Sequence, residues 1–164
     1  MAKKVFLEIR PEPAYYTMIG ISCHLKDYRL SYLLNQELEF KFTRIDDLVA
    51  FLPGKKIQAE FALYHFRDED RFNTYCLLAN RNQEAVLVPE LKQTDFFLLV
   101  EGEFRKAQKD PVLKAIRSIP NVLTAYEIRL ADVKNTDSLL TDIEMHLMNV
   151  LKEKKKQYVL KPNH

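Results

Sequence analysis

Two stretches of this chain are apolar at every position, and they limit its fold more than any other feature. Phe96–Val100 and Tyr75–Ala79 each lack a charged side chain. Successive side chains of a strand point to opposite faces, so a sheet with one wet face alternates apolar and polar residues. Neither stretch alternates. Both faces of the sheet must therefore be covered, by helices or by another subunit.

Periodicity elsewhere predicts a mixture of strands and helices. The leucines between residues 30 and 38 follow one face of a helix, with Asp27 as its expected N-cap. Asp110 and Pro111 form a typical helix start. No period is readable over residues 40–58. We expect strands over residues 5–9, 15–21, 60–66, 72–80, 84–88, 96–100 and 122–128, and helices over residues 27–38, 110–118 and 137–156.

These elements predict an α+β fold, with a mainly antiparallel sheet of five or six strands, helices packed on it and a C-terminal helix. The strands over residues 60–88 form a meander, and residues 95–128 have the length of a βαβ crossover with two parallel strands. That half resembles ferredoxin-like and ACT-like modules, a topological likeness that implies no function. We expect one globular domain over residues 1–135. A C-terminal helix and basic tail over residues 136–164 pack on it or extend from it.

The covering of the sheet bears on the oligomeric state. The helices over residues 27–38 and 110–118 are expected to share one face. The other face needs the C-terminal helix, the segment over residues 40–58 or a second subunit. For this reason we expect a homodimer.

The chain has only three glycines, which excludes several kinds of site. A dinucleotide fingerprint needs glycines clustered in one turn, and a phosphate-binding loop needs Gly-x-x-x-x-Gly-Lys. Gly54-Lys55 is the one Gly-Lys pair, and Val49 stands where the first glycine belongs. The Gly-x-Ser-x-Gly elbow of serine hydrolases is missing too. We expect no cofactor.

Positive charge is concentrated at the C-terminal end. The whole chain has a net charge of +2, yet residues 152–164 hold five lysines and one glutamate. The rest is slightly acidic, which argues against a body shaped to bind nucleic acid. A solvated helix end that complements the helix dipole is the simpler interpretation. The alternative is contact with RNA through Lys152, Lys154, Lys155 and Lys156.

The sequence indicates a cytoplasmic protein without membrane contact. No apolar run approaches the ~20 residues of a membrane span, and the N-terminus lacks the apolar region of a signal peptide. Two isolated cysteines do not make a disulfide framework.

Cys23, His24, His65 and Cys76 are candidates for a metal site or for nucleophilic catalysis. Zinc ligands usually come in pairs about two to five residues apart, and that spacing is missing here. We therefore expect no metal, and favour buried thiols and partly buried imidazoles. Cys23 as a nucleophile, with His24 or His65 as its base, is the alternative.

Glu90 and Asp95 flank a turn opened by Pro89. Two carboxylates across a turn can bind a cation or act as an acid–base pair. They can equally cap backbone amides, which is the usual role of acidic residues at turn ends, and we favour this interpretation.

The segment Val88-Pro89-Glu90-Leu91-Lys92-Gln93-Thr94-Asp95-Phe96 resembles the signature of the bacterial IPExxxVDY family. It keeps Pro89, Glu90 and Asp95, and differs by having Val88, Thr94 and Phe96 in place of isoleucine, valine and tyrosine. The resemblance, which extends over about residues 3–140, implies a small cytoplasmic bacterial protein and no assigned activity. It also marks Asp27 and Arg29, in Lys26-Asp27-Tyr28-Arg29-Leu30, as motif residues.

Taken together, the residues favour a non-catalytic binding or regulatory module that acts as a homodimer with an unknown protein partner. One alternative is an RNA- or ribosome-associated protein that uses the basic C-terminal end. It predicts salt-dependent binding that disappears when residues 152–164 are deleted. The other is an enzyme that uses Glu90, Asp95 or Cys23.

Overall fold

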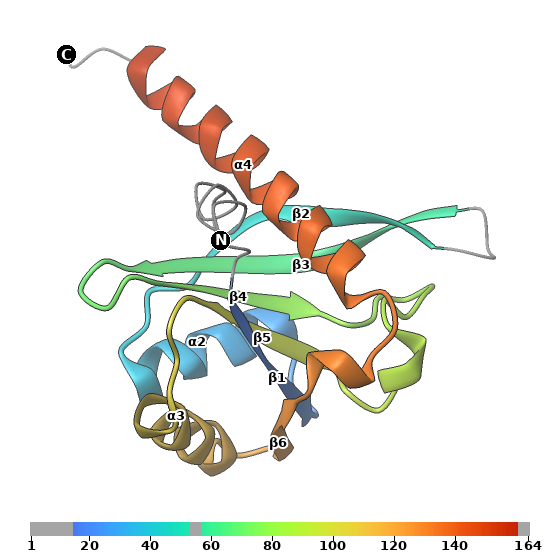
Figure 1. Ribbon diagram of the computed structural model, residues 1–164, viewed down its shortest axis with the longest axis vertical. Coiled ribbons are helices and arrows are strands. Elements are labelled where there is room, and N and C mark those ends of the chain that lie inside the picture. Colours follow the sequence, from blue (N-terminus) through green and yellow to red (C-terminus); the bar gives the residue numbers. More distant parts are fainter. Residues whose placement is uncertain (1–14, 53–56, 161–164) are drawn as a thin grey trace, which may run out of the picture.

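The structure is a computed structural model that describes residues 15–52 and 57–160, with side chains as far as residue 152. Its centre is a six-stranded sheet in the order β2-β3-β4-β5-β1-β6 (Figure 1). The strands are β1 (Tyr16–Cys23), β2 (Thr43–Leu52), β3 (Ile57–Asp68), β4 (Asn73–Ala79), β5 (Phe96–Glu101) and β6 (Val122–Ile128). The helices are α2 (Asp27–Leu38), α3 (Lys106–Ser118) and α4 (Thr136–Leu160), and the short 3-10 helices are η1 (Pro89–Leu91) and η2 (Leu130–Asp132).

The topology is α+β, as expected, and all neighbouring strands run antiparallel. Both β5 and β6 pair with β1, so they run parallel to each other with β1 between them. α3 connects β5 to β6, which fits the expected βαβ crossover. The two parallel strands of this crossover are not neighbours in the sheet. β1 and β4 also run parallel to each other, with β5 between them. The chain that connects β1 to β4 forms α2, β2 and β3.

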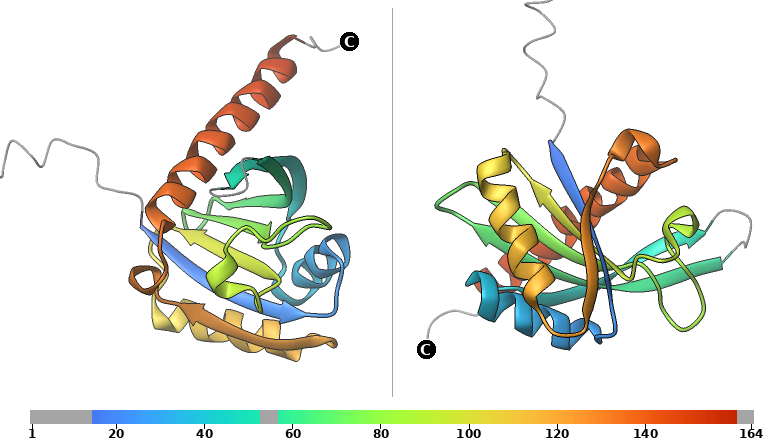
Figure 2. Two further views of the ribbon diagram at one scale, coloured as in Figure 1. Left: turned by 90° about the vertical axis from the view of Figure 1, so that its right-hand side faces the viewer. Right: turned by 90° about the horizontal axis from the view of Figure 1, so that it is seen from below.

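The two faces of the sheet are covered by the chain itself. α2 and α3 lie together on one face, as predicted, where Leu30, Leu34 and Ile116 are fully buried. α4 crosses the opposite face (Figure 2). There Ile143 belongs to one buried apolar cluster with side chains of β2, β3 and β4. The strands that are apolar on both sides therefore do not by themselves require a second subunit.

Residues 43–52, which show no readable period, form the edge strand β2. The pairing with β3 shifts between Ile45 and Leu48, and the buried positions are Ile45, Leu48, Ala50 and Leu52. The first interval is three residues and the later ones are two. This bulge interrupts the alternation by which a strand is recognised.

The strand expected over residues 84–88 is wrong, and so is the meander that included it. The side-chain oxygen of Asn82 accepts hydrogen bonds from the amides of Glu84 and Ala85, both at 2.7 Å, so these amides turn away from a strand ladder. Only the isolated bridge between Arg81 and Val86 remains. The antiparallel meander consists instead of β2, β3, β4 and β5.

Two helix starts also differ from the sequence prediction. Asp27 is the first residue of α2, and Lys26 is its N-cap. α3 begins at Lys106, one turn before the expected start, and contains Pro111. The side chain of Gln108 accepts a hydrogen bond from the amide of Arg105 at 3.2 Å, which supports the earlier start. Pro111 lies inside this helix, where it lacks the N–H that would donate to the carbonyl of Ala107 and where its ring crowds that carbonyl.

α4 extends well past the body of the molecule (Figure 1). Met145 and Met148 on this helix are 59% and 70% exposed. None of the helices in the described part of the chain is long and apolar enough to cross a membrane. The strand expected over residues 5–9 lies outside the described residues, and so do Gly54 and Lys55.

Candidate functional site

The turn that carries the signature is held by a buried asparagine that sequence reasoning did not single out. Asn80 is 0% exposed and follows β4. Its Nδ2 donates to the carbonyls of Leu91 at 2.9 Å and Thr94 at 2.8 Å, and its Oδ1 accepts from the amide of Val88 at 2.8 Å. These bonds fix both ends of η1, in which Pro89 occupies the first position and presets the backbone angle.

Asp95, immediately before β5, joins separate parts of the chain. Its Oδ2 accepts from the amide of Cys23 at 2.9 Å, and its Oδ1 lies 3.1 Å from Nε of Arg81. Its own amide donates to the carbonyl of Ile21 at 2.9 Å. This is what a capping carboxylate does, and it fits the capping interpretation.

Glu90 lies away from Asp95. Its Oε2 accepts a long hydrogen bond, 3.5 Å, from the amide of Lys134. Glu90 lines a cavity of about 440 Å³ between η1, the end of β2 and the start of α4, whereas Asp95 lines a different cleft. The two carboxylates thus share neither a cation site nor an acid–base pair.

Asp95 does share its cleft, of about 500 Å³, with Asp27. Asp27 Oδ2 accepts from the hydroxyl of Tyr64 at 2.8 Å and from Arg44 at 3.2 Å. Burial and the hydrogen bond to Asp27 raise the pKa of Tyr64 to about 12. Arg44 also pairs with Asp47 at 2.8 Å. The charges of this cleft largely neutralise one another.

The remaining candidates from the sequence do not assemble into reactive chemistry. The Cys23 thiol lines the same cleft, but burial and the nearby Asp95 raise its pKa, whereas a nucleophile needs the thiolate. Cys76 belongs to the core on the opposite face of the sheet, where burial raises its pKa to about 12. Among the described residues, no three His, Cys, Asp or Glu side chains are grouped to hold a metal ion. Arg29 lies outside the cleft, over the ring of Tyr32.

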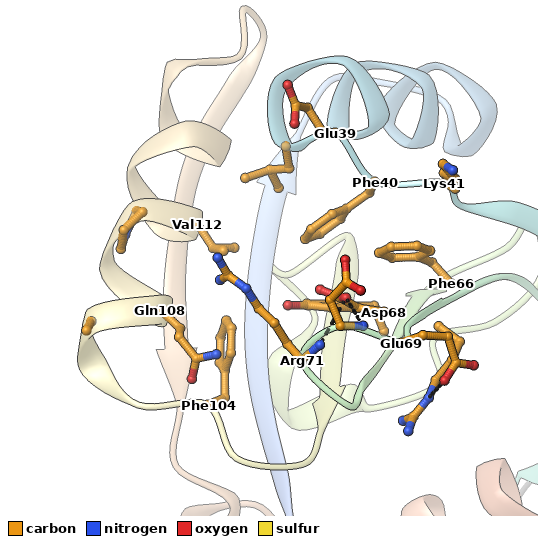
Figure 3. A pocket seen from close by; sticks show the side chains of 16 residues that line it. Glu39, Phe40, Lys41, Phe66, Asp68, Glu69, Arg71, Phe104, Gln108 and Val112 are labelled. Atoms are coloured by element: carbon orange, nitrogen blue, oxygen red, sulfur yellow. Dashed lines mark hydrogen bonds and ion pairs between the residues drawn. The ribbon is translucent and has the colours of Figure 1, made fainter.

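A further cavity, of about 650 Å³, opens between the end of α2, the start of α3 and the β3–β4 tip (Figure 3). We call it the aromatic pocket, because Phe40, Phe66, Tyr75 and Phe104 line it. The Phe40 ring centroid lies 4.5 Å from that of Tyr75 and 5.3 Å from that of Phe66. The Phe66 and Tyr75 rings stack at 5.7 Å. Rings this close form a continuous apolar wall.

Charged side chains surround this wall. Figure 3 shows Arg71 reaching toward Gln108 and Val112 of α3, while Asp68 lies nearer to Phe66. Asp68 Oδ1 accepts from the backbone amides of Asp70 at 3.0 Å and Arg71 at 3.2 Å. The turn at the β3–β4 tip is therefore fixed by Asp68, and this turn carries Arg71 into the pocket.

Tyr75 contributes both a largely buried ring and a polar hydroxyl to the pocket. The residue is 3% exposed, and its hydroxyl has no hydrogen-bond partner in the part of the chain that the structure describes. Burial and the negative charge of Asp68 raise its pKa to about 12, while Arg71 acts in the opposite direction. At neutral pH this hydroxyl is protonated and can donate to or accept from a molecule in the pocket.

None of the motif residues lines the aromatic pocket. In the sequence, the aromatic residues of this pocket lie on four separate segments and form no pattern. Only the fold brings them together. Comparison with models of known protein families and with characterised proteins found no match for this chain. The likeness of the turn at Pro89 to the IPExxxVDY signature stays a prediction.

Proposed function

We propose that this protein is a non-catalytic binding or regulatory module, and that the aromatic pocket is its ligand site. The observation that carries the proposal is a cavity of about 650 Å³ with an aromatic wall, in which the hydroxyl of Tyr75 has no hydrogen-bond partner among the described residues. Ligand sites are typically about 300–1,000 Å³, mostly apolar, with a few polar groups that orient the ligand. The aromatic pocket falls within this range of volume and has an apolar aromatic wall, and about half of its lining residues are charged or polar.

The contacts of the catalytic candidates weigh against the enzyme alternative. Glu90 and Asp95 line different cavities, and Asp95 is engaged by a backbone amide and an arginine. Burial favours the neutral, unreactive form of the Cys23 thiol. A binding role needs none of these groups to be reactive.

The pocket can be tested by blocking it from the surface. Ala107 is exposed on α3 and lines the pocket, so Ala107→Trp places an indole across the opening without changing the core. Ala131, exposed on η2 and outside the pocket lining, gives the matched control Ala131→Trp. We expect 2-phenylethanol to shift the amide NMR signals of the pocket residues in the wild type and in the control, but not in Ala107→Trp. Unchanged shifts in the blocked variant would reject the site.

We also propose that the module is a homodimer, now on the basis of α4. The helix runs beyond the body (Figure 2). Met145 and Met148 expose apolar surface on it. Helical segments without tertiary packing are only marginally stable in water, so contact with a second copy would stabilise this one. Sedimentation at high concentration should give a dimer mass for the wild type. It should give a monomer mass for the double variant Met145→Lys, Met148→Lys, and a wild-type monomer would contradict the proposal.

A cytoplasmic location is part of the same proposal. Cys23 and Cys76 are both buried free thiols, as is usual in a reducing compartment. The RNA alternative depends on Lys152, which is exposed, and on Lys154, Lys155 and Lys156, whose side chains lie outside the described residues. It stays a prediction from the sequence.

A further inference from the structure

The two helix ends at the aromatic pocket carry charges of the unfavourable sign. α2 ends at Leu38 without a basic residue in its last turn, and Glu39 is its C-cap. α3 begins at Lys106 without an acidic residue in its first turn, and Arg105 is its N-cap. A helix is stabilised by cations at its C-terminus and by anions at its N-terminus. Both ends break this rule where they line the same cavity, and local rules of this kind are commonly broken at functional sites.

The side chains of the pocket add to this division of charge. In Figure 3, Arg71 extends to the α3 side, whereas Asp68 and Glu69 lie on the side of β3, and Glu39 lies at the end of α2. In the part of the chain that the structure describes, Arg71 has no ion pair. Two cations lie on the negative side: exposed Lys41 at the mouth near α2, and Arg67 of β3, which pairs with Glu69 at 3.9 Å. One side of the cavity is thus mainly negative and the other is positive.

Burial raises the pKa of Tyr75, the negative charge of Asp68 raises it further and the positive charge of Arg71 lowers it, so charges from both sides act on this hydroxyl. A bound polar group can form a hydrogen bond with this hydroxyl, which has no partner among the described residues. The rings of Phe40, Phe66 and Tyr75 pack on one another, so they make a wall and leave no room for a cation enclosed between them. An apolar group of the ligand would lie flat against this wall.

We propose that the aromatic pocket binds a small zwitterion with an apolar body. Its anionic group faces Arg71 and the start of α3, its cationic group faces Asp68 and the end of α2, and its apolar body contacts Phe40 and Phe66. This inference rests on the proposed function, since it names the ligand class of the same pocket.

Four molecules that share a phenyl ring separate the contributions of charge. They are phenylalanine (zwitterion), 3-phenylpropanoate (anion), 2-phenylethylamine (cation) and 2-phenylethanol (neutral), each titrated into the full chain at pH 7 and followed by amide NMR shifts. We expect phenylalanine to bind at least tenfold more tightly than each of the others. N-acetylphenylalaninamide, which mimics a side chain within a peptide, should bind no better than 2-phenylethanol.

Variants test which side chain of the pocket interacts with each charge of the ligand. Arg71→Gln should weaken binding of phenylalanine and 3-phenylpropanoate at least tenfold, and leave 2-phenylethylamine unchanged. Arg129→Gln is the matched control, because Arg129 lies outside the pocket lining, is 81% exposed and is paired with Asp132. Tyr75→Phe removes only the hydroxyl, and should weaken phenylalanine binding without loss of fold.

The outcomes separate this inference from the proposed function. If 2-phenylethanol binds in the pocket and phenylalanine binds no more tightly, the charge inference is overturned and the binding site stands. Equal binding of phenylalanine and 3-phenylpropanoate, or of phenylalanine and N-acetylphenylalaninamide, also overturns the zwitterion class. Absence of pocket shifts with every probe rejects both proposals.

Discussion

Replacement of Asn80 by alanine should be among the most destabilising single changes in this protein. The side chain makes three hydrogen bonds, to the carbonyls of Leu91 and Thr94 and from the amide of Val88. The bonds to Thr94 and Val88 are buried, and that to Leu91 is partly buried. Each buried backbone group left without a partner costs about 1–3 kcal/mol. We therefore expect Asn80→Ala to lower the free energy of unfolding by about 3–5 kcal/mol, against a typical total of about 5–15 kcal/mol.

Asn82→Ala is a matched control for this measurement. Asn82 also makes three side-chain hydrogen bonds, from the amides of Glu84 and Ala85 and to the carbonyl of Glu60, but these are exposed or partly exposed. Water can replace them, so the expected cost is about 1 kcal/mol. Urea unfolding followed by circular dichroism gives both values from the midpoint and slope. If Asn80→Ala costs no more than Asn82→Ala, the argument that burial sets the cost is wrong.

Three further changes test the packing and ionisation of the core. Gly20→Ala should destabilise the protein by about 1–3 kcal/mol in urea unfolding, because the new Cβ would lie 2.8 Å from Cδ1 of Ile128. An unchanged free energy of unfolding would show that Ile128 on β6 can move aside at little cost. Thr94→Val should lower the free energy of unfolding by about 1–2 kcal/mol, because it leaves the Tyr126 hydroxyl without its partner. The double variant Thr94→Val, Tyr126→Phe should recover most of this loss, and a double-mutant cycle with no coupling between the two residues would contradict the prediction. Above about pH 9 the unfolded thiol of Cys76 ionises, while the folded one stays protonated to about pH 12, so the unfolded state binds fewer protons and stability falls as pH rises. Urea midpoints measured from pH 8 to 11 should decline, with a smaller decline in Cys76→Ala, and identical slopes would refute this assignment.

Much of the fold was predictable because its signals are local. The helix over 27–38 and the strand over 122–128 were predicted at their observed bounds. In the first, a leucine stripe identifies the buried face, and in the second, Pro120 and Asn121 mark where the strand begins. The expected strand over 84–88 failed because Asn80 and Asn82 side chains occupy amides that a strand ladder would need.

The sites were much less predictable. Asp95 was correctly favoured as a cap from its position at a turn end, but neither of its partners, the Cys23 amide and Arg81, is near it in the sequence. Asn80 was overlooked, since an asparagine after a strand is equally typical of an ordinary exposed turn. Its importance comes from burial, which is a property of the packed structure.

The sequence by itself determined that the sheet is covered on both faces, because strands such as Phe96–Val100 have no polar side to expose to water. It also excluded nucleotide loops, because the three glycines are too far apart to let a backbone wrap a phosphate. Only the tertiary structure decided what covers each face: α2 and α3 on one, α4 on the other. It alone assembled the aromatic pocket from four segments, because a cavity is the space left between elements and has no pattern along the chain.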